Sequence, residues 1–243
     1  RFDQAGGVAA LSQAILSGDE AGMLQHLAML APSPSRSQSS TQLDAAIVHG
    51  LAGYVEAVRG EHPLAAVFEA FQRFRILCVH RKGMAGVDEL NRRIEVLLRP
   101  LLPNVVGTSR EWYPGRVVMM RRNDYTLDLY NGDLGIVLVD PADGGALRVF
   151  FEGDATRANG LAPARVAECE TAFAITVHQS QGSEFEHVVL VLPGDHSPLV
   201  TRELLYTAVT RARKTVRVVG DTTTFVQGAL SPQRRTSGLA AKL

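Results

Sequence analysis

One segment of the chain gathers residue types that can hold a phosphorylated ligand. TVHQSQGSEF (176–185) brings three hydroxyls, one histidine and one glycine together directly after a strand-like run. Hydroxyls and backbone N–H groups bind phosphates, and a glycine allows a ligand to approach the backbone closely. In a parallel sheet such loops bind ligands outside the carboxyl ends of the strands. The alternative interpretation is an ordinary polar turn.

A second segment, YTAVTRAR (206–213), carries Arg211 and Arg213. We expect a helix from Arg202 to Arg213, with both arginines near its carboxyl end. Arginines there complement the helix dipole. The functional alternative is an arginine finger, a planar and permanently charged group directed at a phosphoryl group in transfer.

The sequence contains no phosphate loop. Such a loop needs spaced glycines followed by Lys-Ser or Lys-Thr, and neither GGVAALSQA nor RKGMAGVDE supplies that unit. Nucleotide contacts from residues 176–213 therefore require a partner segment that holds the phosphates.

Composition limits the class of protein. The 243 residues are 46% hydrophobic with a formal net charge of zero, which indicates a globular chain and argues against a generic nucleic-acid binder. Residues 71–99 nevertheless hold seven basic and three acidic side chains. Cys78 and Cys169 lack metal-ligand spacing, so we expect buried reduced thiols and no metal site. The apolar runs are short and no secretory signal is present, so a cytoplasmic location is the default.

The elements that must position these segments alternate between strands and helices. Apolar residues at helical spacing predict one helix over 42–59 and another from Pro63 to Phe74. Residues 75–81 and 84–100 predict a strand, a loop and a helix that ends at Pro100. Further strands are expected at 173–179, 187–193 and 215–221, with a last helix from Thr222. This alternation predicts a mostly parallel sheet with helices on its faces.

Residues 112–165 differ from the rest of the chain. Three strand-like runs, RVVMMRRN, DLGIVLVD and LRVFFEG, are separated by turn residues and nothing looks helical, which predicts a small antiparallel barrel inserted into the α/β domain. Asn131-Gly132 predicts a tight hairpin turn rather than a DNA contact. Trp112 and Tyr113 can stack on bases, but we favour a role in anchoring the insert.

The two chemical segments and the strand between them resemble motifs V and VI of superfamily 1 helicases of the 5′-to-3′ branch. TVHQSQGSEFEHVVLVLP (176–193), VTRELLYTAVTRARKTVRVVGD (200–221) and ILCVHRKGMAGVDELNRRIE (76–95) are similar to successive stretches of the RecD family, the alpha subunits of bacterial exodeoxyribonuclease V. The resemblance covers essentially the whole chain.

This resemblance implies a motor with two RecA-like domains, with ATP and Mg²⁺ bound between them and single-stranded DNA running across both. The chain resembles the second domain, formed by 1–111 and 168–243, with an SH3-like insert at 112–167. The domain with the phosphate loop is then expected before Arg1, and the segment alone is expected to be inactive. The implied partners are DNA ends and RecB-like and RecC-like subunits, in double-strand-break repair and recombination.

The resemblance also implies roles for individual residues. Arg211 matches the arginine finger, and Arg1 resembles an arginine that reaches the γ-phosphate. The nucleotide side matches Gly182, Ser183 and Glu184, with Glu184 facing the ribose. The DNA side matches Thr176, His178, Gln179 and Ser180, with Arg81 as a further candidate. Family members often carry lysine where this chain has Gln179, so a phosphate contact there stays open.

Two other functions remain open. One is a related superfamily 1B helicase that stands alone or is linked to a relaxase. The other is a degenerate helicase domain that only binds DNA or protein, although a scaffold has no need for Arg211 and Glu184. The sequence shows no cluster of carboxylates of the kind that two-metal nucleases use.

Overall fold

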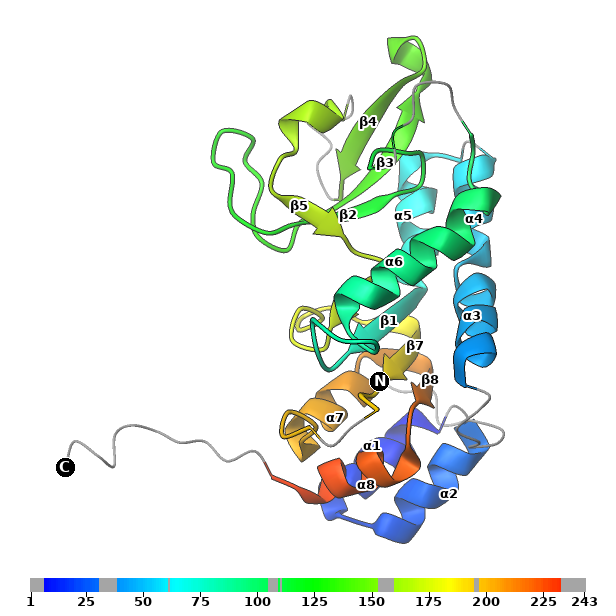
Figure 1. Cartoon of the computed structure of the whole chain (residues 1–243), viewed down its shortest axis with the longest axis vertical. Helices are drawn as coiled ribbons and strands as arrows, with labels where there is room; N and C mark the ends of the chain where they lie inside the picture. The colour runs from blue at the N-terminus through cyan, green and yellow to red at the C-terminus, as the bar shows by residue number, and fades with distance from the viewer. Residues whose placement is uncertain are drawn as a thin grey trace, which may run out of the picture.

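The chain forms two sheets: it leaves the parallel sheet after one strand, forms all four strands of the antiparallel sheet, and then returns to the parallel one. The computed structural model describes residues 7–30, 39–60, 62–104, 109, 111–152, 160–194 and 197–232. One sheet is parallel with the strand order β6-β1-β7-β8, and the other is antiparallel with the order β4-β3-β2-β5 (Figure 1).

The parallel sheet is built from four short strands. They are β1 (Phe74–Cys78), β6 (Ala174–Thr176), β7 (Phe185–Val191) and β8 (Ala212–Val219). Every residue of β1 is buried, as are the last four of β7, because helices cover both faces of a parallel sheet. The predicted parallel α/β sheet is confirmed.

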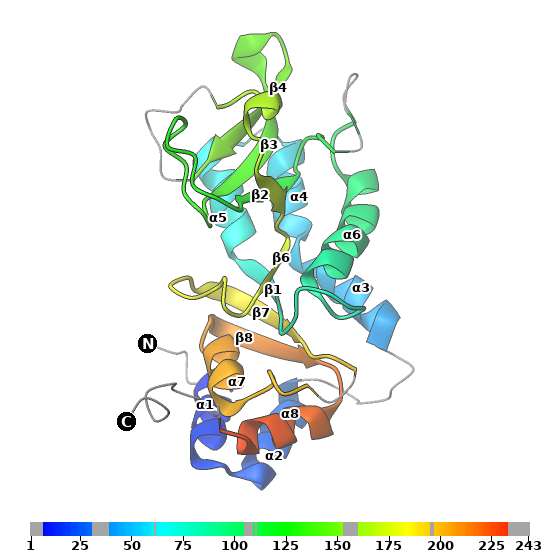
Figure 2. The same cartoon turned by 60° about the vertical axis from the view of Figure 1, so that its left-hand side comes forward.

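Helices pack on both faces of this sheet, as predicted (Figures 1 and 2). Those on one face are α1 (Val8–Ser17), α2 (Glu20–Leu30), α7 (Arg202–Val209) and α8 (Thr222–Leu230). Those on the other are α3 (Ser39–Gly50), α4 (Ala52–Arg59), α5 (Leu64–Gln72) and α6 (Val87–Leu98), the last followed by a short 3₁₀ turn, η2 (Arg99–Leu101). No helix in the described part of the chain is long and apolar enough to span a bilayer.

Two helix predictions were wrong, one in the middle of the expected helix and one at its end. The helix expected over 42–59 is divided at Leu51 into α3 and α4. Gly50 allows this break to lie against the sheet, since a Cβ there would meet the Phe74 ring at 2.3 Å. The helix expected to reach Phe74 ends at Gln72, because Phe74 is already paired with His187 in the sheet.

The antiparallel sheet has four strands rather than three. They are β2 (Val117–Met120), β3 (Leu134–Asp140), β4 (Ala146–Phe151) and β5 (Cys169–Thr171). β5 pairs with β2 and lies beyond the expected boundary at residue 167, and its polar sequence hid it from hydrophobic patterning. Within the described residues β4 and β5 are the outer strands of this sheet, and Val149 of β4 also forms a single antiparallel bridge with Leu161, so closure into a barrel stays a prediction. Two 3₁₀ turns, η3 (Pro141–Asp143) and η5 (Pro163–Arg165), also contradict the expectation of no helical residues.

The turn at Asn131-Gly132 forms as predicted, but it does not join the strands by itself. The Asp133 N–H donates to the Tyr130 carbonyl oxygen at 3.0 Å, and Gly132 has a φ of +97°. The whole connection between Met120 and Leu134 is a longer excursion, which includes a second turn closed by Asp124 and Leu129.

Buried polar contacts join the two sheets. The Tyr113 hydroxyl donates to Glu95 of α6 at 2.9 Å, and Tyr113 is 3% exposed, so its predicted anchoring role is confirmed. The partly buried Trp112 packs on the small core of the antiparallel sheet beneath the Arg116 guanidinium. Asn91 of α6 bonds the Thr171 carbonyl oxygen at the end of β5 and both backbone groups of Ala174, the first residue of β6 (Ala174–Thr176).

Candidate nucleotide and DNA site

The segment 176–185 runs from the side of the parallel sheet where its strands end, the carboxyl edge, to the side where they begin, the amino edge. Thr176 lies level with Cys78 and Val191, at the carboxyl ends of the strands. Phe185 pairs with Ala212 at the amino ends, six residues before Val191, which corresponds to roughly 20 Å along the strand. The expectation that the whole segment lies at the carboxyl edge was therefore wrong for its second half.

At the carboxyl edge, Thr176 and Gln179 hold each other in a closed turn. Gln179 Oε1 accepts hydrogen bonds from the Thr176 N–H at 3.0 Å and from the Thr176 hydroxyl at 3.1 Å. The Gln179 N–H in turn contacts Thr176 Oγ1 at 3.2 Å. This clasp fixes the turn that carries the exposed His178.

Ser180 does not lie on the surface. Its side chain is fully buried and its hydroxyl donates to the Val177 carbonyl oxygen at 2.7 Å. The predicted DNA contact of Ser180 is thus corrected, because its hydroxyl serves the turn itself.

Consecutive hydrogen bonds connect the two ends of the segment. The Ser180 N–H donates to the carbonyl oxygens of Thr176 and Val177, and the Ser183 N–H donates to the Ser180 carbonyl oxygen at 3.1 Å. These bonded turns connect Thr176 with Ser183 near the opposite end of the sheet.

At the amino edge, Arg211 is bonded to the same segment. Its Nη1 donates to the Ser183 carbonyl oxygen at 2.8 Å, and its Nε lies 3.3 Å from the Thr207 carbonyl oxygen of α7. Gly182 has a φ of +88°, and a Cβ there would meet nothing within 4 Å. The backbone beside the Arg211 guanidinium is consequently open to a ligand.

Arg211 and Arg213 do not lie on a helix, contrary to expectation. α7 ends at Val209, and the Arg211 carbonyl oxygen accepts a hydrogen bond from the Phe185 N–H at 2.8 Å. This bond commits the chain to β8, where Arg213 donates from Nε to Glu184 Oε2 at 3.0 Å. The role of Arg213 in holding Glu184 was missed. In an extended chain, residues two apart such as Arg211 and Arg213 lie on one face, so both could have been expected to face the same segment.

Arg81, the further DNA candidate, follows β1 at the carboxyl edge. Its Nη1 donates to Glu170 Oε1 of β5 at 2.9 Å, and Asp88 lies 3.7 Å away. The Arg81 side chain is 43% exposed, so these ion pairs leave part of the guanidinium open to solvent. Arg1, the other predicted catalytic arginine, lies outside the described residues.

Cys78 is buried at the centre of this site and is chemically silent. Burial raises the pKa of its thiol to about 12, which keeps it neutral near pH 7 and unsuited to act as a nucleophile. Among the described residues, no three His, Cys, Asp or Glu side chains gather in a way that could hold a metal ion.

A cleft of about 510 Å³ borders the turn, lined in part by His178, Gln181, Thr201 and Thr207. A larger groove of about 850 Å³ runs between α3, α4, α5 and strands β7 and β8. This groove contains none of the predicted site residues.

The sequence of this chain is similar to those of several known proteins. Residues 171–219, which contain both chemical segments, match the UvrD-like helicase C-terminal domain. The RecBCD enzyme subunit RecD of Mycolicibacterium smegmatis is 44% identical over 170 residues, covering 70% of this chain and 29% of that protein. RecD of Mycobacterium tuberculosis is 41% identical over 169 residues, 70% and 28% of the two chains. RecD of Haemophilus influenzae is 36% identical over 178 residues, 73% and 26%.

The chain thus spans less than a third of the length of these relatives. Among solved structures, the Pif1 helicase from Bacteroides in complex with ADP-AlF3 and single-stranded DNA aligns with 76% of this chain and 51% of its own, at 17% identity and a TM-score of 0.42. The matched part of the chain is a RecD-like superfamily 1B helicase C-terminal segment.

Proposed function

We propose that this chain is the second motor domain of an ATP-dependent DNA helicase that moves 5′ to 3′ along one strand. The observation that carries the proposal is the bonded segment from Thr176 to Ser183, which connects the two edges of the sheet and ends on Arg211. A motor needs such a connection, because hydrolysis at one site must change the grip on DNA at another.

The nucleotide binds at the amino edge. Arg211 stabilises the charge on the phosphoryl group in transfer, Gly182 and Ser183 offer open backbone, and Glu184, held by Arg213, contacts the ribose. ATP and Mg²⁺ require a phosphate loop, which this sequence lacks, so that loop belongs to a domain outside this chain. The 243 residues alone therefore do not hydrolyse ATP.

Single-stranded DNA binds at the carboxyl edge. His178 is exposed there beside the clasped Thr176 and Gln179, and Arg81 adds a partly exposed positive charge. Ser180 supports this surface from within.

The antiparallel strands form an SH3-like insert within the RecA-like domain. The insert spans residues 112–167, and the RecA-like domain is formed by 1–111 and 168–243. Strand β5, just after residue 167, completes the sheet of the insert. The anchoring bonds of Tyr113 and Asn91 make the insert part of the DNA-binding platform.

The partners follow from the relatives. Proteins named as RecD subunits of the RecBCD enzyme lead us to propose RecB-like and RecC-like subunits, DNA ends as substrate, and a role in double-strand-break repair and recombination. A second candidate is a stand-alone helicase, which the ATP-dependent RecD2 DNA helicase of Deinococcus radiodurans favours at 39% identity over 139 residues.

Unwinding assays test the proposal on the protein together with its phosphate-loop domain. Duplexes with a 5′ overhang should be unwound in the presence of ATP and Mg²⁺, and duplexes with only a 3′ overhang should not. Unwinding from the 3′ overhang alone would refute the polarity. Absence of unwinding from both, with ATP turnover intact, would favour a translocating or binding module.

A further inference from the structure

Two arginines from different sheets converge on one carboxylate at the carboxyl edge. Arg81 follows β1 of the parallel sheet, and Arg121 follows β2 of the antiparallel sheet. Both approach Glu170 of β5: Arg81 contacts both carboxylate oxygens, with Nη1 at 2.9 Å from Oε1, and Arg121 Nε lies 3.6 Å from Oε2.

The carboxylate lies beneath the two guanidinium groups. The Glu170 side chain is 17% exposed, whereas Arg81 is 43% and Arg121 56% exposed. Guanidinium groups bind carboxylates and phosphates through the same fork of N–H donors. Glu170 therefore contacts the two arginines from the protein side, and the space between the arginines also suits a phosphate group.

This arginine pair adjoins the turn that carries His178. Thr176 and Cys78 are paired at the ends of their strands, and Arg81 comes three residues after Cys78. Met119 is paired with Glu170 in the antiparallel sheet, and its sulfur lies 3.9 Å from Gln179 Nε2. The backbone of a DNA strand that passes over His178 can thus continue directly to Arg81 and Arg121.

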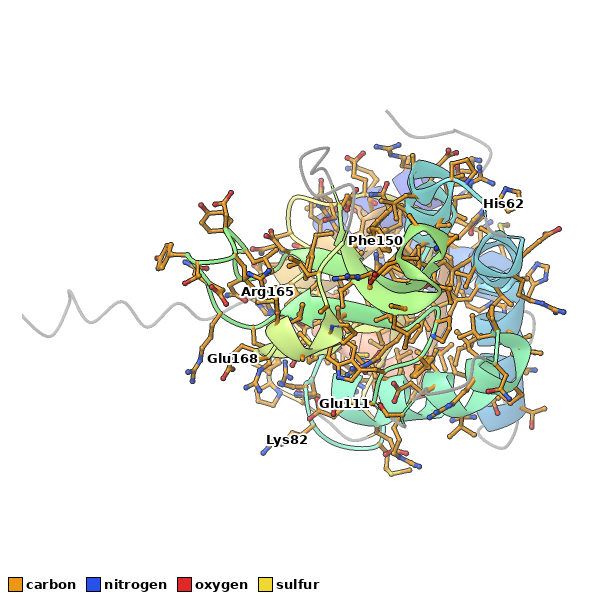
Figure 3. The ribbon with its side chains drawn as sticks, turned by 90° about the horizontal axis from the view of Figure 1, so that it is seen from above. His62, Lys82, Glu111, Phe150, Arg165 and Glu168 are labelled. Atoms are coloured by element: carbon orange, nitrogen blue, oxygen red, sulfur yellow. The ribbon has the colours of Figure 1, made fainter. Side chains whose placement is uncertain are left out.

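Neighbouring charges define this surface further. Seen from above, Lys82 and Glu168 lie on the same side of the molecule (Figure 3). Arg122 is 77% exposed and only 4.0 Å from Glu168, and Asp88 lies 3.7 Å from Arg81. Among the described residues of this surface, Glu168 and Asp88 each pair with one arginine, whereas Glu170 is shared by two.

We propose that Arg81 and Arg121 together bind one backbone phosphate of single-stranded DNA, and that Glu170 is the internal competitor for this site. The inference rests on the proposed function and extends the DNA path from the parallel sheet onto the antiparallel one. Both arginines are about half exposed, and a phosphate offers the same kind of oxygen acceptor as the carboxylate, so it can compete with Glu170 for their N–H donors. The same contact releases a counterion, which makes the affinity depend on salt.

The test measures binding of a fluorescent oligothymidylate by anisotropy, without nucleotide, at several salt concentrations. Arg121→Ala should weaken binding roughly five- to tenfold at 50 mM salt and reduce the slope of log affinity against log salt by about 0.7. Glu170→Gln should strengthen binding roughly two- to fivefold and leave the fold intact. The protein is used with all of its domains.

Two controls separate this site from general electrostatics. Arg73 is as exposed as Arg121, at 56%, but it lies before the amino end of β1 and is paired with Glu69 of α5. Arg73→Ala should therefore change the affinity for DNA less than twofold. Glu168→Gln removes a negative charge from the same surface without touching the shared carboxylate. If Glu168→Gln strengthens binding as much as Glu170→Gln, the competitor role is refuted.

The outcome also distinguishes this inference from the proposed function. If His178→Ala weakens DNA binding while Arg121→Ala and Glu170→Gln bind like the wild type, the two-arginine site is refuted and the DNA-binding edge stands. If the wild-type protein does not bind the oligonucleotide at all, both are refuted.

Discussion

Arg211 donates a hydrogen bond of 2.8 Å to the carbonyl oxygen of Ser183, so the arginine and the turn are held together before any nucleotide is bound. The Thr207 carbonyl oxygen at the end of α7 orients the same guanidinium from a second direction. A side chain fixed in this way loses little conformational freedom when a ligand arrives, which is the condition for efficient charge stabilisation.

Asn91 is predicted to be essential for the joint between the two sheets. The side chain is 5% exposed and makes three hydrogen bonds of 2.8–3.0 Å to Thr171 and Ala174. Asn91→Ala leaves these buried backbone groups unpaired and should lower the free energy of unfolding by about 2–4 kcal/mol in urea titrations. Arg92→Ala, at the next and exposed position, should change it by less than about 0.5 kcal/mol. Equal effects of the two substitutions would contradict this role.

Cys78 should make stability depend on pH in the alkaline range. Burial raises the pKa of the folded thiol to about 12 from an ordinary value near 9. Between these values the unfolded thiol loses its proton and the folded thiol keeps it, so stability present below pH 9 is lost as the pH rises. From pH 8 to pH 10, the wild type should lose about 1 kcal/mol more than Cys78→Ala.

Taking the difference between these two proteins at each pH cancels the contribution of other buried groups such as Tyr54, whose pKa is also raised by burial. Parallel stability curves over this range would mean that the Cys78 thiol ionises as readily in the folded state as in the unfolded one.

Gln179 is predicted to act on DNA binding through the turn rather than by direct contact. Gln179→Ala removes the acceptor for both Thr176 groups and should lower the free energy of unfolding by about 1 kcal/mol and weaken binding of single-stranded DNA. Gln179→Glu keeps an acceptor oxygen, so stability should be nearly unchanged. Its added negative charge should still weaken DNA binding and reduce the salt slope. Stability that falls equally in both variants would refute the clasp.

The sequence was sufficient for most of the fold. Strands β1 and β7 contain apolar runs, β8 carries several β-branched residues between its basic ones, and the buried stripe of α3 and α4 follows helical spacing. The ends of elements were less predictable. α7 stops at Val209 because Arg211 is bonded to Phe185 across the sheet, and nothing local to YTAVTRAR encodes that partner.

The candidate site was predictable in its segments but not in its pairings. Arg211 and Glu184 were identified by resemblance to a helicase motif. The contacts of Arg213 with Glu184, and of Arg81 and Arg121 with Glu170, join residues that are 29 or more positions apart or come from different sheets. Ser180 was misassigned because a serine inside a polar turn and a serine on its surface look alike in sequence.

ATP hydrolysis by the 243-residue chain alone should not exceed the background. Gly182, Ser183 and Arg211 offer contacts to a nucleotide, but the chain has no loop to hold the phosphates with Mg²⁺. The measurement is release of phosphate in the presence of oligothymidylate. Turnover that Arg211→Ala abolishes would mean that the chain contains a complete site.

The role of Arg211 as the arginine finger is tested most directly by the rate of DNA-stimulated ATP turnover of Arg211→Ala, in the protein together with its phosphate-loop domain. This role predicts that kcat falls by roughly three to five orders of magnitude. The affinity for single-stranded DNA and the unfolding midpoint should stay close to those of the wild type. A kcat within about tenfold of the wild-type value, in a folded variant that binds DNA, would contradict the role of Arg211. It would also contradict the proposal that this chain supplies one half of the ATP site.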